Sequence, residues 1–213
     1  MMPDKNPTLH GNAPDKAEAA LLLIDVINDL EFREGEQLLE FAVPMARNLL
    51  GLKRRAKQAG IPAIYVNDNF RRWRSDFNSQ VEHCLNDGVR GQPIAELLQP
   101  DDDDYFVLKP KHSGFYSTAL DILLRYLGVN IVILTGIAGD ICVLFTANDA
   151  YLRDLKLIVP GDCVASNTQE ENQNALDQMH KVLKADTRPS TQLDLASVNS
   201  RQTAVGNRQN DRR

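Results

Sequence analysis

The sequence predicts a three-layer α/β fold of the Rossmann-like class, with a mainly parallel sheet between two layers of helices. Apolar runs of strand length alternate with segments of helical pattern through residues 18–189. The strand runs are continuously apolar, which is typical of strands buried on both faces. Gly60 and Gly128 follow helical segments, at positions that favour a helix stop. Together these observations favour one parallel sheet covered on both faces.

The expected elements follow one another in order along the chain. The expected strands are Ala20–Val26, Ile61–Val66, Tyr105–Lys109, Asn130–Thr135, Leu155–Val159 and, on a weaker pattern, Val182–Ala185. The expected helices are Gln37–Ala59, Ser117–Leu127, Asp140–Arg153 and Thr168–His180. Short runs rich in β-branched and leucine residues indicate the strands, and longer segments of helical periodicity indicate the helices.

Both ends of the chain differ in composition from its centre. Residues 1–17 mix Pro, Asn, Asp and Lys, and residues 190–213 are rich in Ser, Asn, Gln and Arg. Such segments bury little apolar surface, so we expect two flexible tails. The 213-residue chain is then expected to hold a single domain at residues 18–189.

The composition narrows the expected partners and compartment. The formal net charge of −5 predicts neither a nucleic-acid-binding surface nor a polybasic membrane anchor. The N-terminus lacks a secretory pattern, and the apolar runs are much shorter than the ~20 residues that span a bilayer. Three widely spaced cysteines without a CxxC pair are typical of a reduced, cytoplasmic protein.

Cys142 lies where a predicted strand turns into a predicted helix. It follows an apolar run and a small-residue turn, Gly136-Ile-Ala-Gly-Asp140. The positive end of the helix dipole is expected to favour the thiolate, which is the reactive form of cysteine. Cys142 is therefore a candidate nucleophile, and the alternative is a small core residue.

Two more reactive side chains are expected at the same edge of the sheet. Ligands of parallel sheets bind beyond the carboxyl ends of the strands, where Asp25 and Lys109 lie. Lys109 would neutralise a buried Asp25 and hold a thiolate in its charged form. Asp25 could take the thiol proton and later return it to a leaving amine. One alternative is that Asp25 has only a structural role. Another is that Lys111, on the same face of the strand, takes the place of Lys109.

Attack of the thiolate on a carbonyl would create an oxyanion that needs preorganised donors. The backbone N–H groups of Ala138 and Cys142 are the candidates, because both belong to the turn that precedes the helix. The product of the attack would be a thioester, which water then cleaves.

Three segments carry a family resemblance. They are Leu22-Leu-Ile-Asp-Val-Ile-Asn-Asp29, then Val107-Leu-Lys-Pro-Lys-His-Ser-Gly-Phe115 with Thr118 and Leu120, then Thr135-Gly-Ile-Ala-Gly-Asp-Ile-Cys-Val143 with Thr146, Asp149 and Ala150. Through about residues 20–188 the chain resembles the isochorismatase-like cysteine hydrolases, which include nicotinamidases and N-carbamoylsarcosine amidohydrolases. The resemblance implies an Asp–Lys–Cys triad at Asp25, Lys109 and Cys142, and a cis peptide bond between Ile137 and Ala138. It also implies a six-stranded sheet and a homo-oligomer, either a dimer or a tetramer.

The departures from the family pattern concern the metal and the substrate. Nicotinamidases place an Asp and two His after the second strand to hold a metal ion, whereas residues 67–77 here contain Asp68 and no histidine. We therefore expect no metal or other cofactor, and nicotinamide is disfavoured as substrate. Gly139 stands where the family commonly has Thr. The acidic run Asp101–Asp104 lacks the spacing of a calcium loop and is interpreted as a solvated turn.

Four side chains are candidates for substrate contact: Asp29, Trp73, Arg74 and Phe115. Arginines at residues 71–74 follow the second strand and would suit a substrate carboxylate, with a charged surface or a subunit contact as the alternative. Asp29 is expected either to orient the site or to pair with an arginine. Phe115 is expected either to line the pocket or to pack beside a helix.

The expected function is hydrolysis of a C–N bond in a small amide or carbamoyl compound through a Cys142 thioester. One alternative is vinyl-ether hydrolysis of the isochorismatase type, for which family members often lack the cysteine. Another is a non-catalytic binding or scaffold module on the same fold. A thiol sensor is a third, and it would need a resolving thiol near Cys142.

Overall fold

Six parallel strands form one sheet. The structure is a computed structural model that describes residues 16–69 and 76–200. The strands are β1 (Ala19–Ile24), β2 (Ala63–Asp68), β3 (Tyr105–Lys109), β4 (Ile131–Ile137), β5 (Lys156–Ile158) and β6 (Val164–Ala165). Their order is β3-β2-β1-β4-β5, with β6 also paired to β4, and every pairing is parallel. The predicted six-stranded sheet is confirmed.

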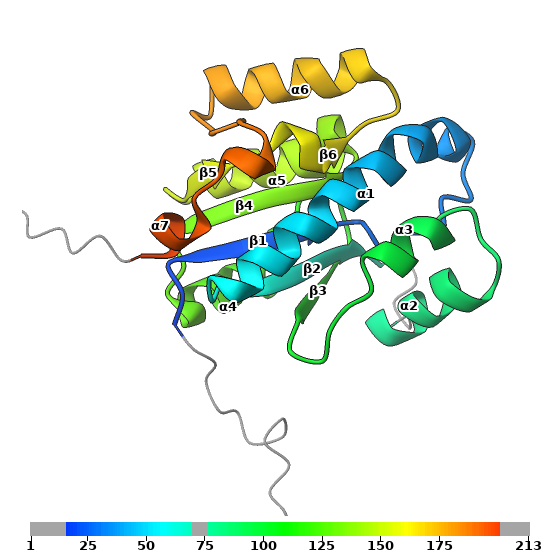
Figure 1. Cartoon of the computed structure of the whole chain (residues 1–213), viewed down its shortest axis with the longest axis horizontal. Coiled ribbons are helices and arrows are strands. Elements are labelled where there is room, and N and C mark those ends of the chain that lie inside the picture. Colours follow the sequence, from blue (N-terminus) through cyan, green and yellow to red (C-terminus); the bar gives the residue numbers. More distant parts are fainter. Residues whose placement is uncertain (1–15, 70–75, 201–213) are drawn as a thin grey trace, which may run out of the picture.

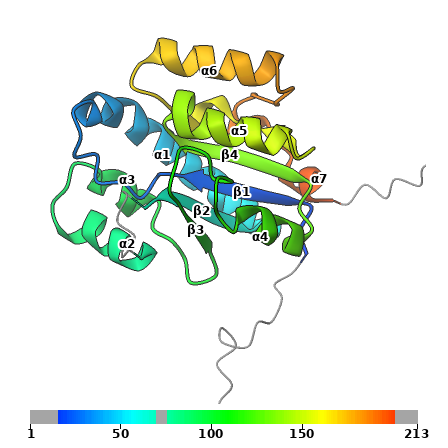
Figure 2. The same cartoon turned by 180° about the vertical axis from the view of Figure 1, so that it is seen from behind.

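Helices cover both faces of this sheet. They are α1 (Gly35–Gln58), α2 (Phe77–Asn86), α3 (Gln92–Leu97), α4 (Leu120–Leu127), α5 (Leu144–Tyr151), α6 (Gln169–Lys181) and α7 (Leu195–Asn199). Short helical turns form η2 (Gly139–Val143), η3 (Gly161–Cys163) and η4 (Ser190–Gln192). Figure 1 shows α1 and α3 in front of the sheet, and Figure 2 shows α4 and α5 in front after a half turn. The predicted three-layer fold is confirmed.

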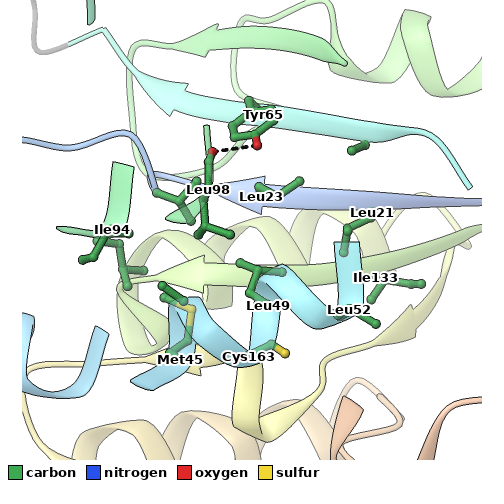
Figure 3. Packing of buried hydrophobic residues seen from close by; sticks show 14 of the residues in the cluster. Leu21, Leu23, Met45, Leu49, Leu52, Tyr65, Ile94, Leu98, Ile133 and Cys163 are labelled. Atoms are coloured by element: carbon green, nitrogen blue, oxygen red, sulfur yellow. Dashed lines mark hydrogen bonds between the residues drawn. The ribbon is translucent and has the colours of Figure 1, made fainter. Parts of the chain in front are cut away.

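The central strand β1 explains why its sequence is continuously apolar. All six of its residues are buried. Leu21 and Leu23 pack in the cluster that contains Leu49 of α1, as Figure 3 shows, whereas Leu22 and Ile24 belong to the cluster on the other face. A strand covered on both faces needs apolar side chains at every position.

Four elements differ from the expectation. Val182–Ala185 is not a strand, because Val182 caps the end of α6 and the apolar side chains behind it pack against the sheet. The sixth strand is instead β6, whose two residues are too few to show a pattern. Helices α2 and α3 were not predicted, although their buried faces complete the core on the α1 side.

The C-terminal residues 190–200, expected to belong to a flexible tail, form η4 and α7 and pack against the core. Leu193 and Leu195 are buried. Asn199 Oδ1 accepts hydrogen bonds from the N–H groups of Glu18 and Ala19, and its Nδ2 donates to the carbonyl of Ala59. This asparagine ties α7 to the start of β1 and the end of α1. Residues 1–15 and 201–213 lie outside the described residues.

None of the helices in residues 16–69 and 76–200 combines the length and the apolar character that crossing a bilayer requires.

The carboxyl ends of β1 to β4 meet at one edge of the sheet. Ile24 pairs with Gly136, and Asp68 pairs with Lys109. Gly136 has a φ of 109°, and a Cβ there would lie 2.0 Å from the carbonyl oxygen of Ile24. Only glycine lets β4 pass β1 so closely in this conformation. The residues that follow these four strands therefore lie together.

Candidate active site

A buried ion pair lies at this edge. Lys109 Nζ is 2.8 Å from Asp25 Oδ2 and 3.7 Å from Asp68 Oδ2. Lys109 is fully buried and Asp25 is 4% exposed. The other oxygen of Asp25, Oδ1, accepts the backbone N–H of Asp68 at 2.6 Å. Because an unpaired charge would be very costly at such depth, these contacts account for the presence of Asp25 and Lys109 in the core.

Asp25 is the first residue after β1 and adopts a left-handed backbone, with a φ of 52°. This conformation costs a non-glycine residue about 1–3 kcal/mol, and strained residues of this kind cluster at functional sites. The N–H of Asp25 still donates to the carbonyl of Val66 at 3.0 Å, so the turn stays attached to β2. The turn places the carboxylate beside Lys109.

Cys142 completes a three-residue cluster with this pair. Its side chain lies in η2, the turn between β4 and α5, and Lys109 Nζ donates to Cys142 Sγ at 3.5 Å. The Asp25 carboxylate that pairs with Lys109 also acts on this thiol and raises its pKa. The structure thus brings together Asp25, Lys109 and Cys142, which lie on three separate segments of the sequence.

The charges in this cluster determine the state of the thiol at rest. Burial raises the pKa of Cys142, the Asp25 carboxylate raises it further, and Lys109 opposes both. Burial likewise raises the pKa of Asp25 against the effect of Lys109. Burial alone would lower the pKa of Lys109, but Asp25 and Cys142 raise it above its ordinary value. Burial and Asp25 thus act against the thiolate that the helix N-terminus was expected to favour, and the carboxylate of Asp25 is the group that can accept the thiol proton.

The thiol opens onto a pocket of about 490 Å³. Besides Asp25 and Cys142, the lining residues are Asn28, Phe32, Glu34, Leu38, Asp68, His112, Ile137, Ala138, Ile141 and Asn167. A larger hollow of about 690 Å³ lies beside β5, near the opposite ends of the strands. None of the described residues that line that hollow is a cysteine, serine or histidine, so the smaller pocket is the candidate site.

The turn that carries Cys142 also carries the expected oxyanion donors. Ala138 and Cys142 both line the pocket, and the peptide bond between Ile137 and Ala138 is cis, as the resemblance implied. The carbonyl of Ala138 accepts the N–H groups of Ile141 and Val143, which holds the turn closed. N–H groups at the start of a helix lack partners within it, so they are available to an anion.

Packing explains why residue 139 is a glycine in this chain. A Cβ at residue 139 would lie 2.5 Å from Asn172 Oδ1 and 2.6 Å from Val164 Cγ1. A threonine here would require the side chains of Asn172 and Val164 to move. A polar contact remains nearby, because Ser166 Oγ accepts the N–H of Asp140 at 3.2 Å.

The remaining predicted substrate contacts do not lie in the pocket or cannot be placed. Asp29 pairs with His83 at 3.4 Å, rather than with an arginine, and is not among the pocket residues. Phe115 packs in the core under α4 and α5, with the guanidinium of Arg153 4.6 Å from its ring centre. Trp73 and Arg74 lie outside the described residues.

The acidic run Asp101–Asp104 is not simply a solvated turn. The side chain of Asp104 is 1% exposed and lies 2.6 Å from the buried Lys53 Nζ. Lys57 binds three carboxylates of the same run, those of Asp101, Asp103 and Asp104. The run is therefore part of a structural ion-pair network.

Several pocket residues were missed as candidates in the sequence, among them Asp68 and His112. Asp68 was considered only as a metal ligand, and His112 was not considered for the site. His112 lies three residues after Lys109, and its Nδ1 is 3.9 Å from Cys142 Sγ. Its closeness to Lys109 in the sequence was the signal that could have found it.

The comparisons with known proteins agree with the resemblance in the three segments. The isochorismatase domain model matches residues 19–187. An uncharacterized isochorismatase family protein of Bacillus subtilis, YaaI, is 46% identical over 178 residues, covering 84% of this chain and 97% of YaaI. The isochorismatase of Bacillus subtilis is 33% identical over 172 residues, covering 77% of this chain and 53% of that longer protein. Among solved structures, the N-carbamoylsarcosine amidase of Thermoplasma acidophilum has a TM-score of 0.64 at 28% identity, covering 83% of this chain and 99% of that chain.

Proposed function

The chain belongs to the isochorismatase family of hydrolases, and we propose that it hydrolyses a C–N bond of a small amide or carbamoyl compound through a Cys142 thioester. One observation carries the proposal. Lys109 contacts both the Cys142 thiol and the Asp25 carboxylate, and Cys142 and Asp25 both line a pocket. A nucleophile, a base and a cation held together in this way are the requirements of covalent acyl transfer.

The proposed reaction begins with transfer of the thiol proton to Asp25 as the sulfur attacks the substrate carbonyl. The raised pKa of Asp25, caused by burial, makes this carboxylate a stronger base than an exposed one. Lys109 stabilises the negative charge that develops on sulfur, because its Nζ lies 3.5 Å from Sγ. The C–N bond then breaks as the nitrogen takes up a proton, and water cleaves the resulting thioester.

The backbone N–H groups of Ala138 and Cys142 are the proposed oxyanion donors. Both residues line the pocket beside the reacting sulfur. The loss of one such donor typically lowers the rate by about 10²–10³-fold. In this proposal the ammonium group of Lys109, rather than a metal ion, balances the carboxylates of Asp25 and Asp68.

Vinyl-ether hydrolysis is the second candidate, because the isochorismatase of Bacillus subtilis is 33% identical to this chain. That reaction does not need a thiol nucleophile. The contact of Cys142 with Lys109, the partner of Asp25, would then serve no chemical step, so the geometry favours the amide reaction.

A substrate panel tests the choice between the two reactions. The panel contains small primary amides, N-carbamoyl compounds and isochorismate, with release of ammonia or amine and loss of isochorismate as the readouts. We expect turnover of at least one amide or carbamoyl compound, and no turnover by Cys142→Ala. Loss of isochorismate at equal rates with both proteins, without turnover of any amide, would favour the vinyl-ether reaction instead.

A further inference from the structure

We propose that His112 is a second proton-transfer residue of this site. It protonates the leaving nitrogen when the thioester forms, and it takes a proton from the attacking water when the thioester is cleaved. This inference rests on the proposed thioester mechanism and assigns the proton transfers that Asp25 does not perform.

His112 faces the reacting sulfur from the pocket. Its Nδ1 is 3.9 Å from Cys142 Sγ, and its side chain is exposed and lines the pocket. The ring packs against the ring of Phe145 at a centroid distance of 5.4 Å and a tilt of 52°. An imidazole held beside the nucleophile and open to solvent can both donate and accept protons.

The distance between His112 and Cys142 is maintained by a short chain of hydrogen bonds. Thr146 Oγ1 donates to the carbonyl of Cys142 at 2.7 Å and accepts the N–H of Gly114 at 3.0 Å. Gly114 follows His112 by two residues, so the backbone of the histidine segment is tied to the backbone of the cysteine turn. Phe145 also lies on the helix that begins after Cys142, and its ring supports the imidazole.

The leaving nitrogen lies within reach of His112. In the tetrahedral intermediate this nitrogen is only two bonds from Sγ, so a group that faces the sulfur from the pocket can come within the ~2.6–3.2 Å needed for proton transfer. Asp25 was expected to return the thiol proton to the leaving amine, but in this proposal it returns that proton to the sulfur. It is 4% exposed, and its two oxygens are engaged by Lys109 and by the N–H of Asp68.

The proton transfers of the cycle balance, and water is the only reactant needed besides the substrate. In the first half, the thiol proton moves to Asp25, and protonated His112 gives its proton to the nitrogen as the electron pair of the C–N bond leaves with it. In the second half, water adds to the thioester carbonyl and its proton moves to the now neutral His112. The C–S bond then breaks, and the sulfur recovers its proton from Asp25. The products are an amine and a carboxylic acid, and both residues return to their starting states.

p-Nitrophenyl acetate separates the two halves of this cycle, because p-nitrophenolate leaves without a proton. The full-length protein would be compared with His112→Ala and His112→Gln, and His83→Ala would serve as a matched control at an exposed histidine outside the pocket. The readouts are p-nitrophenolate release and the fraction of acetylated Cys142, measured by mass spectrometry after rapid quenching.

We expect both His112 variants to release p-nitrophenolate at the normal initial rate and then to accumulate acetyl-Cys142. Cleavage of this thioester should be slower by about 10²-fold or more, which is the usual effect of removing a general base. Added imidazole should accelerate the cleavage in His112→Ala, and His83→Ala should behave as the unaltered protein.

Three outcomes contradict the inference in distinguishable ways. Normal thioester cleavage in His112→Ala would show that His112 transfers no proton from water. Loss of the initial release in both His112 variants would show that the histidine acts on the thiol instead. Absence of Cys142-dependent release in the unaltered protein would overturn the thioester mechanism itself, and the role of His112 with it.

Discussion

Two buried lysine–aspartate pairs lie within residues 16–69 and 76–200, and one of them is at the candidate active site. Lys109 and Asp25 lie 2.8 Å apart, with side chains 0% and 6% exposed. Lys53 and Asp104 lie 2.6 Å apart, with side chains 5% and 1% exposed. Distance and burial therefore do not distinguish the two pairs.

The two pairs differ in the groups that each lysine contacts besides its aspartate. Lys53 Nζ also donates to the Tyr65 hydroxyl at 3.0 Å and to the carbonyl of Gln99 at 3.2 Å, so its remaining donors hold α1 against the sheet. Lys109 Nζ donates instead to Cys142 Sγ, beside a pocket. A buried ion pair is thus a structural element by itself, and a nucleophile and a pocket next to it provide the means for chemistry.

Replacement of the two aspartates should separate the pairs most clearly. We expect Asp25→Asn to lower the rate of amide or carbamoyl hydrolysis by about 10²–10⁴-fold, because attack on such an unactivated carbonyl needs Asp25 to take up the thiol proton. Asp104→Asn should leave the rate per folded molecule unchanged. Initial rates, corrected for the folded fraction by circular dichroism, measure both effects. Equal losses in the two variants would show that Asp25 acts through stability alone.

Alkylation of Cys142 should respond in the opposite direction to hydrolysis. The reagent reacts with thiolate, and burial and Asp25 both raise the pKa of this thiol while Lys109 lowers it. Alkylation by iodoacetamide should therefore keep rising with pH beyond ~8.5, the ordinary thiol value. At pH 7 it should be faster in Asp25→Asn and slower in Lys109→Met than in the unaltered protein. Mass spectrometry of the Cys142 peptide gives the rates, and slower alkylation of Asp25→Asn would contradict the assigned charges.

Removal of the other lysine should affect stability and spare the chemistry. Lys53→Met leaves the buried Asp104 with only Lys57 as a counterion, and the loss of one partner of a buried pair typically costs about 3–5 kcal/mol. Because Lys57 remains, we expect about 3 kcal/mol, measured by urea denaturation. The double variant Lys53→Met/Asp104→Leu should recover most of this loss. A stable Lys53→Met, or a double variant as unstable as the single one, would show that the pair contributes little to stability.

The sequence predicted the sheet better than it predicted the pocket. The expected strand Tyr105–Lys109 coincides with β3, and the expected strand Ala20–Val26 overlaps β1, whose continuous apolar run is produced by burial on both faces. Asp25, Lys109 and Cys142 were also placed together correctly, because strand ends in a parallel sheet converge on one edge. Their proton states were not predictable, because the pKa of Cys142 depends on burial and on neighbours that are distant in sequence.

Pocket residues were harder to predict. The apolar pattern indicates which residues are buried, but not whether a side chain points into the pocket or into the core. Phe115 was expected either in the pocket or in the core, and the structure places it in the core with Arg153 over its ring. Asp29 was expected to orient the site or to pair with an arginine, and its partner is His83, 54 residues away. His112 gave no metal-ligand pattern, and only the fold places it beside Cys142.

An exposed ion pair provides the smallest contrast with the two buried ones. His83 is hydrogen-bonded to Asp87 and faces Asp29, and both carboxylates raise the pKa of His83, chiefly through the Asp87 hydrogen bond. A raised pKa in the folded state means that the pair stabilises the protein below the unfolded histidine value of ~6.5 and that this contribution is lost as the pH rises through the folded value.

Because the side chain of His83 is 44% exposed, we expect Asp87→Asn to cost less than about 0.5 kcal/mol at pH 5.5 and nothing at pH 9. Urea denaturation at the two pH values measures the difference, with Asp177→Asn on α6 as an exposed control. A cost as large as that of Lys53→Met would mean that burial is not what makes the two lysine pairs strong.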